Sequence, residues 1–350
     1  MCQKKDIKSM TYEELEEFVI GLGEKKFRAS QIYDWMHVKL ASSFDEMTNL
    51  PVSFREKLKK NCELTVLTQA DRLISSIDGT EKFLFALSDG NVVESVLMKY
   101  EHGLSVCISS QVGCRMGCRF CASTIDGLVR NLTPAEMLDE IYRIQNCHEE
   151  RVSHIVIMGS GEPMDNYDNF VRFIRLISSE KGLNISQRNI TVSSCGIVPR
   201  IKQLADEGLH ITLAVSLHAP NDELRKQTMP IANAYSISEI SEAASYYFEK
   251  TGRRITFEYA LIKGQNDSRQ CAEELSHIAG PLHAHVNLIP VNPIEERDYR
   301  QTEAAQIAAF KNDLEKRGIN VTIRREMGRD ISGACGQLRR RYINQIEAGK

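Results

Sequence analysis

The chain has 350 residues, of which 42% are hydrophobic, and its formal net charge at pH 7 is −3. This length suggests one large domain with a smaller one attached. The negative net charge excludes a uniformly basic protein that coats nucleic acid, but it does not exclude a local basic patch. No membrane span is predicted, because no run of about 18 apolar residues occurs, and no signal peptide is predicted, because the N-terminus lacks an apolar core and a cleavage site. We therefore expect a cytoplasmic protein whose ten cysteines are thiols, metal ligands or catalytic groups rather than a disulfide scaffold.

The first 103 residues predict two small units. Residues 1–62 read as short helices, and Thr11 with Glu14 has the pattern of a capping box. Residues 63–103 alternate apolar and polar positions around the pairs Asp78-Gly79 and Asp89-Gly90, which are hairpin signals. We expect a helical accessory domain over 1–62, followed by an antiparallel β meander over 63–103 that links it to a core over 104–350.

Beyond residue 104, apolar strands alternate with amphipathic helices. The predicted strands are 105–110, 154–159, 189–194, 211–218, 254–262 and 285–292. The predicted helices are 133–147, 166–179, 199–207, 236–250, 268–279 and 302–316. Six β–α units imply a parallel sheet, with a further strand at 320–325 that closes or flanks it. A partial (β/α)6 barrel or a doubly wound sheet fits, and in both the site lies at the C-terminal ends of the strands.

Cys114, Cys118 and Cys121 form a C-x3-C-x2-C pattern directly after the first of these strands. Three buried thiols are the simplest interpretation, but glycines and arginines surround them. A structural zinc site needs four protein ligands with no open coordination position, and the candidates for the fourth ligand are Cys107, Cys147 and His148. A 4Fe-4S cluster with three thiolates leaves one iron open for a cofactor, and an odd number of ligands suits it best.

The cysteine pattern resembles that of the radical S-adenosylmethionine (SAM) superfamily, in which SAM chelates the open iron and is cleaved to a 5′-deoxyadenosyl radical. Further motifs narrow the resemblance: "ISSQVGCRMGCRFCAST", "RNLT", "GSGEPMDN", "SLHAPNDELRKQTMPI", "HVNLIPVNP" and "TIRREMGRDISGACGQL". Together they resemble the RlmN/Cfr family of RNA adenine methyltransferases over about residues 9–341. The fold that this implies is a partial (β/α)6 radical SAM barrel.

The resemblance also implies a reaction. The family methylates an adenosine at carbon 2 or, in the Cfr resistance branch, at carbon 8, and Pro163 resembles the carbon-2 branch. Ser160 departs from the methionine usual at its position. The implied substrates are 23S rRNA and the adenosine beside the anticodon in tRNA. The implied cofactors are one 4Fe-4S cluster and two SAM molecules per methylation. The implied partner is a low-potential electron donor, such as flavodoxin or ferredoxin, that reduces the cluster. We expect a monomer. The alternative from another class is a zinc-stabilised RNA-binding module without turnover.

By resemblance, three residues carry the transfer. Cys335 carries the methyl group, and Cys107 resolves the protein–RNA crosslink by forming a disulfide bond with it. Glu94 accepts a proton. From its own pattern, Glu94 alternates with apolar positions, so it is either a buried carboxylate with a raised pKa or an edge-strand glutamate in water. The resemblance assigns SAM binding to the residues Gly161, Glu162, Ser193, Ser216, Leu217, His218 and Asn292.

A basic cluster lies near the C-terminus. Six guanidinium groups come from Arg324, Arg325, Arg329, Arg339, Arg340 and Arg341. A solvated charge run is the usual interpretation, but their closeness to Cys335 favours a phosphate-binding patch, which Arg115, Arg119 and Arg130 would extend. The accessory domain is expected to bind RNA. The target adenine must be unstacked from its neighbouring bases to reach the site.

Overall fold

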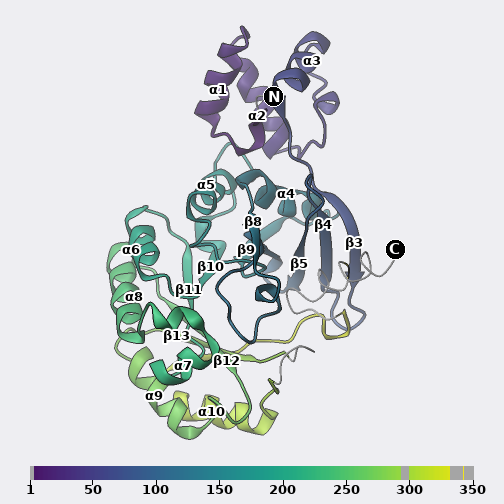
Figure 1. Cartoon of the computed structure of the whole chain (residues 1–350). Coiled ribbons are helices and arrows are strands. Elements are labelled where there is room, and N and C mark those ends of the chain that lie inside the picture. The colour runs from purple at the N-terminus through teal and green to yellow at the C-terminus, as the bar shows by residue number, and fades with distance from the viewer. Residues whose placement is uncertain (1–3, 293–298, 332–341, 343–350) are drawn as a thin grey trace.

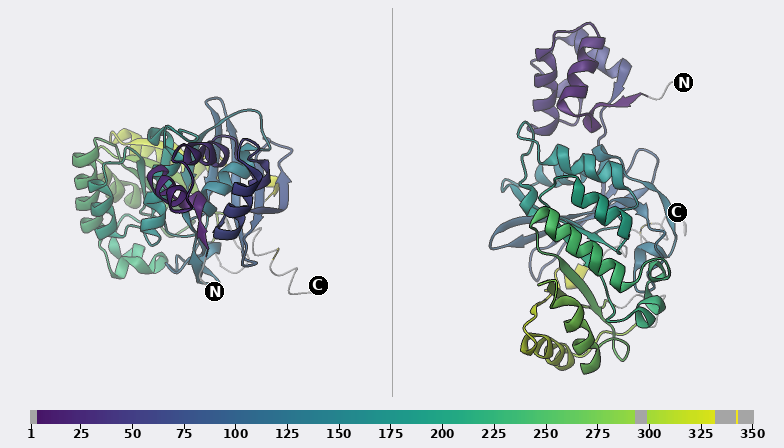
Figure 2. Two further views of the ribbon diagram at one scale, coloured as in Figure 1. Left: turned by 90° about the horizontal axis from the view of Figure 1, so that it is seen from above. Right: turned by 90° about the vertical axis from the view of Figure 1, so that its left-hand side faces the viewer.

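The computed structural model describes residues 4–292, 299–331 and 342. A small helical domain at the N-terminus contains α1 (Tyr12–Gly21), α2 (Phe27–His37) and α3 (Val52–Asn61), with the short strands β1 (Lys5–Asp6) and β2 (Cys62–Glu63) pairing in parallel. The capping box at the start of α1 is confirmed, because the Thr11 and Glu14 side chains each accept from the other's backbone amide. These helices enclose a core of their own, separate from the core of the sheet. In Figure 2 this domain forms a lobe at one end of the molecule.

A continuous sheet of ten strands runs through the rest of the described chain, in the order β14-β13-β12-β11-β10-β9-β6-β5-β4-β3. Its parallel strands are β6 (Gly103–Ile108), β9 (Val152–Ile157), β10 (Ile190–Ser194), β11 (Thr212–Ser216), β12 (Thr256–Leu261), β13 (His285–Pro290) and β14 (Asn320–Ile323). The predicted meander is β3 (Thr68–Ile74), β4 (Glu81–Ala86) and β5 (Val92–Tyr100), all antiparallel. Because β5 also pairs with β6, the meander extends the core sheet.

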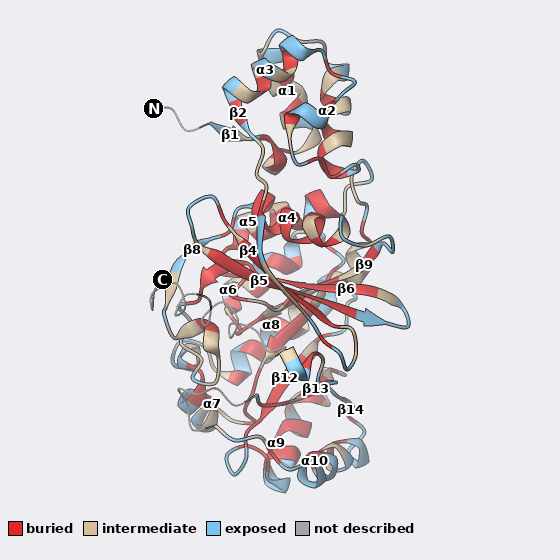
Figure 3. Cartoon of the chain, turned by 90° about the vertical axis from the view of Figure 1, so that its right-hand side faces the viewer, coloured by how far each residue is buried: buried red, intermediate tan, exposed pale blue. Residues whose placement is uncertain are grey.

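Helices cover the outer face of the parallel strands (Figure 1). They are α4 (Pro134–Gln145), α5 (Tyr167–Ile177), α6 (Val198–Asp206), α8 (Ile237–Thr251), α9 (Arg269–Ala279) and α10 (Ala304–Lys316). Six β–α units with a seventh parallel strand beside the last confirm the predicted partial barrel. The parallel strands are buried or half-buried (Figure 3), as expected of parallel strands covered by helices, except for β14 at the edge of the sheet, which is mostly exposed. Among the described helices, none has the length and apolar character needed to cross a bilayer.

Two local features differ from the sequence prediction. The fourth parallel strand ends at Ser216 rather than at residue 218, because the amides of Leu217 and His218 both donate to the carbonyl of Glu258, at 3.0 and 3.2 Å. This irregularity turns the chain, and His218 takes a left-handed φ of 56°. An unpredicted helix follows, α7 (Asp222–Thr228), whose cap is Asn221. The predicted helix 236–250 is α8, so the connection holds two helices instead of one.

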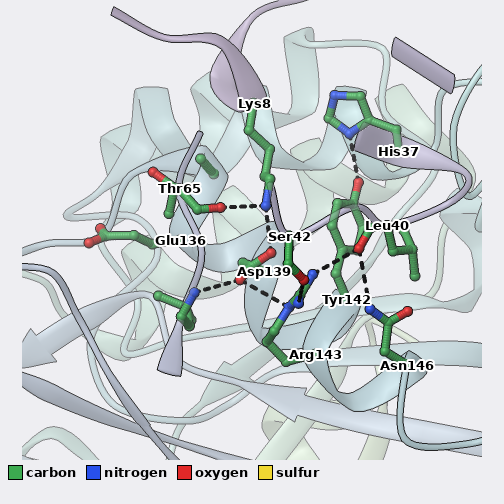
Figure 4. A network of polar contacts seen from close by, with 12 residues as sticks. Lys8, His37, Leu40, Ser42, Thr65, Glu136, Asp139, Tyr142, Arg143 and Asn146 are labelled. Atoms are coloured by element: carbon green, nitrogen blue, oxygen red, sulfur yellow. Dashed lines mark hydrogen bonds and ion pairs between the residues drawn. The ribbon is translucent and has the colours of Figure 1, made fainter. Parts of the chain in front are cut away.

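The helical domain is fastened to α4 by a buried polar junction (Figure 4). The ammonium of Lys8 lies 2.6 Å from the carboxylate of Asp139, and neither side chain is exposed to solvent. Beside this pair, Nδ1 of His37 and the hydroxyl of Tyr142 share a hydrogen bond of 2.8 Å. The Ser9 hydroxyl also accepts the amide of Ala135, at the start of α4. The helical domain therefore has a defined orientation on the core.

Candidate active site

A cavity of about 500 Å³ opens at the C-terminal ends of the parallel strands. The predicted residues that line it are Cys107, Cys114, Cys118, Cys121, Gly161, Glu162, Ser193, Ser216, His218 and Asn292. They come from six different strands or the loops that follow them, so the fold gathers residues up to 185 positions apart in the sequence (107 to 292). A second hollow, between α8 and α9 on the outer face, is open and holds none of these residues.

The three cysteines lie in a loop closed by a small hairpin of β7 (Gln111–Gly113) and β8 (Leu128–Asn131). Within the loop, the Thr124 hydroxyl donates to the carbonyls of Cys118 and Cys121, both at 2.9 Å. Gly113 is required at the entrance. Its φ is 75°, and a Cβ there would lie 2.0 Å from the carbonyl oxygen of Gly127. Hydrogen bonds within the loop thus fix its conformation, and its three thiols line the cavity.

The chemistry of these thiols fits a metal cluster rather than a single ion. Burial raises the pKa of Cys114 to about 12 and raises that of Cys118 as well. The thiolate forms therefore need a cationic partner, as metal coordination provides. Over residues 4–292, 299–331 and 342, no three His, Cys, Asp or Glu side chains have the geometry to hold one metal ion. A 4Fe-4S cluster binds each thiolate through a different iron, so three cysteines are enough to hold it and no fourth protein ligand is needed.

A glycine-rich turn after β9 forms one wall of the cavity. Gly161 has a φ of 108°, and a Cβ there would lie 2.7 Å from the amide nitrogen of Gln111. The carboxylate of Glu162 is 4% exposed and accepts the amides of Cys195 and Met164, at 2.7 and 3.1 Å. Burial is the main cause of its raised pKa. Ser160 is buried but does not line the cavity, so its departure from the family pattern leaves the wall unchanged.

Polar groups from β10 and β11 line the cavity beside this wall, because β10 is the neighbour of β9 in the sheet. The hydroxyls of Ser193 and Ser216 lie 3.2 Å apart on these neighbouring strands. Nδ1 of His218 accepts the amide of Ala260 at 2.9 Å, so Nε2 carries the proton. Burial lowers the pKa of His218 to about 3, which keeps the ring neutral. Leu217 is fully buried and does not line the cavity, so only its backbone could take part in binding there.

Glu94 lies on β5, inside the sheet rather than at its edge, and is 4% exposed. This excludes the alternative of an edge-strand glutamate in water. Its carboxylate pairs with the ammonium of Lys82 on β4 at 2.9 Å, and Lys82 is 0% exposed. Cys107 lies on the adjoining strand, opposite Val96. Glu94 and Cys107 therefore share the face of the sheet on which the cavity opens, although Glu94 itself does not line it.

The basic patch is only partly described. Arg324, Arg325 and Arg329 are exposed at the rim of the cavity. Arg130 does not extend the patch, because Asp89 and Glu136 hold its guanidinium in ion pairs. Arg115 pairs with Asp165 but is largely exposed, and Arg119 is also exposed. The remaining arginines, 339–341, and the predicted methyl carrier Cys335 lie outside the described residues. No disulfide links two of the described cysteines.

Sequence reasoning missed several residues in and behind the cavity. Cys195 was assigned no role, yet it lines the cavity and its backbone holds Glu162. Lys82 was overlooked because its partner is twelve positions away on another strand. The available signal is its position in "EKFLFAL", where a charged lysine precedes a run of apolar residues in a strand that is buried in the structure. Glu258 lines the cavity too, and Asn287 donates to its carboxylate at 2.8 Å.

Comparisons with known proteins agree with this geometry. The profile of the "Radical SAM superfamily" matches residues 108–274, and that of the "Ribosomal RNA large subunit methyltransferase N-terminal domain" matches residues 5–64. A "Probable dual-specificity RNA methyltransferase RlmN" of Lachnospira eligens is 67% identical over 98% of both chains. The chain belongs to the RlmN family. An RlmN of Lachnoclostridium phytofermentans is 62% identical over 99% of this chain and 97% of its own. A radical SAM methyltransferase structure from Sphaerobacter thermophilus has a TM-score of 0.91 at 43% identity, over 95% and 98% of the two chains.

Membership of the RlmN family makes the chain a SAM-dependent radical RNA methyltransferase, so its cofactors are a 4Fe-4S cluster and SAM. The alternative of an RNA-binding module without turnover is thereby excluded. The family match also explains why the cavity is lined by both thiols and polar groups. A methyltransferase of this kind must hold an iron–sulfur cluster, a nucleoside cofactor and an RNA base within reach of one another.

Proposed function

We propose that this RlmN-family enzyme methylates carbon 2 of an adenosine in 23S rRNA and of the adenosine beside the anticodon in tRNA. The observation that carries the proposal is the joint presence, in one cavity, of the three-cysteine loop, the Gly161-Glu162 wall and Cys107. Pro163 favours carbon 2 over carbon 8, and the RlmN names of the relatives agree with it.

Cys114, Cys118 and Cys121 would hold the cluster. When bound, the cluster and SAM supply a 5′-deoxyadenosyl radical. Gly161 lets the backbone approach SAM, and the carboxylate of Glu162 complements its ammonium group. Ser193, Ser216, His218, Asn292 and the backbone of Leu217 would bind the rest of SAM. Since exposed arginines lie at the rim of the cavity, bound SAM and RNA would have to close it and exclude water from the space in which the radical acts.

The transfer itself would use two thiols and one carboxylate. Cys335 would carry the methyl group that one SAM molecule supplies. The cluster and a second SAM would supply the chemistry that removes a hydrogen atom from this methyl group, so that its carbon can bond to the adenine ring; the one electron left in excess would return to the cluster. Glu94, charged and held by Lys82, accepts the proton that leaves carbon 2. The thiolate of Cys107 would attack the sulfur of Cys335, so that a transient disulfide forms while the electron pair of the carbon–sulfur bond leaves with the carbon, which takes up one proton to become the methyl group of the product.

This assignment can be tested by trapping. A Cys107→Ala variant should accumulate a protein–RNA adduct that survives denaturation, because no thiol is left to break the carbon–sulfur bond. A Cys335→Ala variant should keep its cluster but form neither adduct nor methylated RNA. Cys271→Ala is the matched control, since Cys271 is equally buried but lies on α9, outside the cavity. Repeated turnover by Cys107→Ala without an adduct would contradict the role of Cys107.

The site of methylation can be tested directly by mass spectrometry of RNA digests, which should give 2-methyladenosine. Detection of 8-methyladenosine would assign the enzyme to the Cfr branch instead. Parallel reactions with 23S rRNA and with tRNA test the dual specificity. Product from one RNA class alone would restrict the proposal to that class.

We propose further that residues 1–62 form an RNA-binding accessory domain, that 63–103 link it to the core, and that 104–350 are the radical SAM core. The enzyme would act as a cytoplasmic monomer that receives electrons from a flavodoxin- or ferredoxin-type donor. Lys60 is exposed on α3. Reversing its charge in Lys60→Glu should weaken RNA binding and lower its salt dependence while leaving SAM cleavage unchanged. Unchanged RNA affinity across a salt series would contradict an RNA-binding role of this surface.

A further inference from the structure

Arg225 on α7 is a fully buried cation whose role the proposed reaction leaves open. Its side chain is 0% exposed and is the largest of the fully buried side chains. The guanidinium donates to the carbonyls of Cys195, Leu217 and Tyr235, at 2.6, 3.2 and 3.3 Å. All three acceptors are neutral. Among the described residues, no carboxylate forms an ion pair with it; Asp222, at the start of the same helix, interacts with it only electrostatically and is itself half-exposed to solvent.

A buried charge without a counter-charge is strongly unfavourable, and arginine cannot escape the cost by losing its proton at neutral pH. Carbonyl dipoles offset part of the cost. Two of the hydrogen bonds, those to Cys195 and Leu217, also hold together the segments after β10 and β11, which is the simplest structural role for Arg225. A neutral side chain with several donors could fill that role, so it does not explain why a cation is buried here.

The position of α7 indicates which anion compensates the charge. The helix lies directly against the cysteine loop, because the amide of Arg119 donates to the carbonyl of Thr228 at 2.8 Å. The guanidinium interacts electrostatically with the Cys118 thiol. It also holds the backbone of Cys195, and both Cys118 and Cys195 line the cavity. The cation therefore lies behind the wall against which the cluster is expected, shielded from water.

We propose that Arg225 is the buried counter-charge of the 4Fe-4S cluster and raises its reduction potential. This inference rests on the proposed ligation of the cluster by Cys114, Cys118 and Cys121. Three thiolates give the oxidised cluster a net negative charge, and reduction adds one more electron from the external low-potential donor. A fixed cation nearby favours the state with the added electron, and its effect is large because low-polarity protein rather than water lies between them.

The test is a potentiometric titration of the anaerobic holoenzyme without SAM, followed by the electron paramagnetic resonance signal of the reduced cluster. Arg225→Gln removes the charge but keeps hydrogen-bond donors, whereas Arg225→Lys keeps the charge. In the Gln variant the reduction equilibrium should shift at least about tenfold toward the oxidised cluster, which is about 59 mV for a one-electron couple. The Lys variant should stay within about threefold of the wild type, about half that shift.

Lys226→Gln is the matched control. Lys226 is the next residue on the same helix and is exposed, so the same loss of charge should be screened by solvent and leave the potential unchanged. Equal shifts in the Gln and Lys variants, or no shift in the Gln variant, would overturn the proposal. A shift that appears only with SAM bound would overturn it too, because the carboxylate of SAM would then be the counter-charge.

Cluster assembly separates the remaining outcomes. If the Lys variant takes up iron and sulfide but the Gln variant does not, the charge is required for the cluster, which supports the proposal. If both variants fail to assemble the cluster, the geometry of the guanidinium is what the fold requires, and the proposal falls. If wild-type protein itself binds no iron and sulfide, the proposed cluster ligation has failed rather than this inference.

Discussion

The junction between the helical domain and α4 should open when its buried ion pair is broken from one side. Three further groups contact the pair, which Figure 4 shows from close by. Lys8 also donates to the carbonyl of Thr65. The carboxylate of Asp139 also accepts the amide of Leu67 at 2.7 Å and lies 3.2 Å from the guanidinium of Arg143. Removing either charge leaves the other without its ionic partner, but the two remaining groups differ in the hydrogen-bond and charge partners that they keep.

These partners set the size of the effect. Removing one partner of a buried pair costs about 3–5 kcal/mol. Lys8→Met leaves the carboxylate with the Leu67 amide and Arg143, which places the cost near the lower limit, about 3 kcal/mol. Asp139→Leu leaves the ammonium with one carbonyl, which places it near the upper limit, about 5 kcal/mol. The double substitution leaves mainly the orphaned Leu67 amide, at about 1–3 kcal/mol. The double variant should therefore be more stable than Asp139→Leu alone.

The amide of Ala135 reports the opening directly, because it is fully buried and its described acceptor is the Ser9 hydroxyl of the helical domain. A loss of about 3 kcal/mol should speed its hydrogen exchange about 150-fold. Lys57→Met is the control, since Lys57 pairs with Glu24 at the surface of the same domain, and exchange should stay as in the wild type. Exchange within about threefold of the wild type in both single variants would refute the reasoning that this pair holds the junction.

Four further outcomes are expected. Cys118→Ala should lose the brown colour and the bound iron and sulfide, of which the wild type should carry about four each per chain; stoichiometric zinc without sulfide in the wild type would contradict this. Lys82→Met should slow proton removal by Glu94 and trap the adduct on denaturing gels, with partial rescue by Lys82→Arg, whereas normal turnover would separate Lys82 from the reaction. Gly161→Ala should weaken SAM binding at least about tenfold in equilibrium dialysis, because the new Cβ would lie 2.7 Å from a backbone nitrogen; unchanged affinity would remove the glycine from the SAM site. Burial lowers the pKa of His37 to about 3 from its ordinary value of about 6.5, so only the open state binds its proton between these values. The junction should lose about 1.3 kcal/mol between pH 7 and pH 5.5, and exchange in His37→Gln should lack this dependence.

The parallel strands and their helices were predictable because each carries its own signal. A buried strand such as β12 is a short apolar run, and α4 begins with Thr133, Pro134 and Glu136, whose capping pattern is local. The cysteine loop was predictable for the same reason, since all three thiols lie within eight positions. Local signals of this kind require no knowledge of how the chain folds back on itself.

The partners of buried charges could not be predicted in this way. Lys8 and Asp139 are 131 positions apart, and only the docking of the helical domain makes them neighbours. Arg225 lies in the polar stretch "NDELRKQT", where an exposed helix or loop is the natural expectation, yet it is buried because α7 lies against the cysteine loop. In both cases the burial of the charged side chain depends on tertiary contacts, which hydrophobic periodicity in the sequence does not predict.

The attachment of the meander to the first parallel strand has a chemical consequence. Directly opposed residues of an antiparallel pair point to the same face of a sheet, and so do residues two positions apart on one strand. Cys107 on β6 is opposite Val96 on β5, and Val96 is opposite Lys82 on β4. Glu94 therefore shares the cavity face with the thiol and with its own ammonium partner. A slip of one residue between β5 and β6 would turn Glu94 and Cys107 to opposite faces. The hydrogen-bonded register of three antiparallel strands thus brings the proposed proton acceptor and the proposed resolving thiol to one site, which the parallel barrel strands alone would not do.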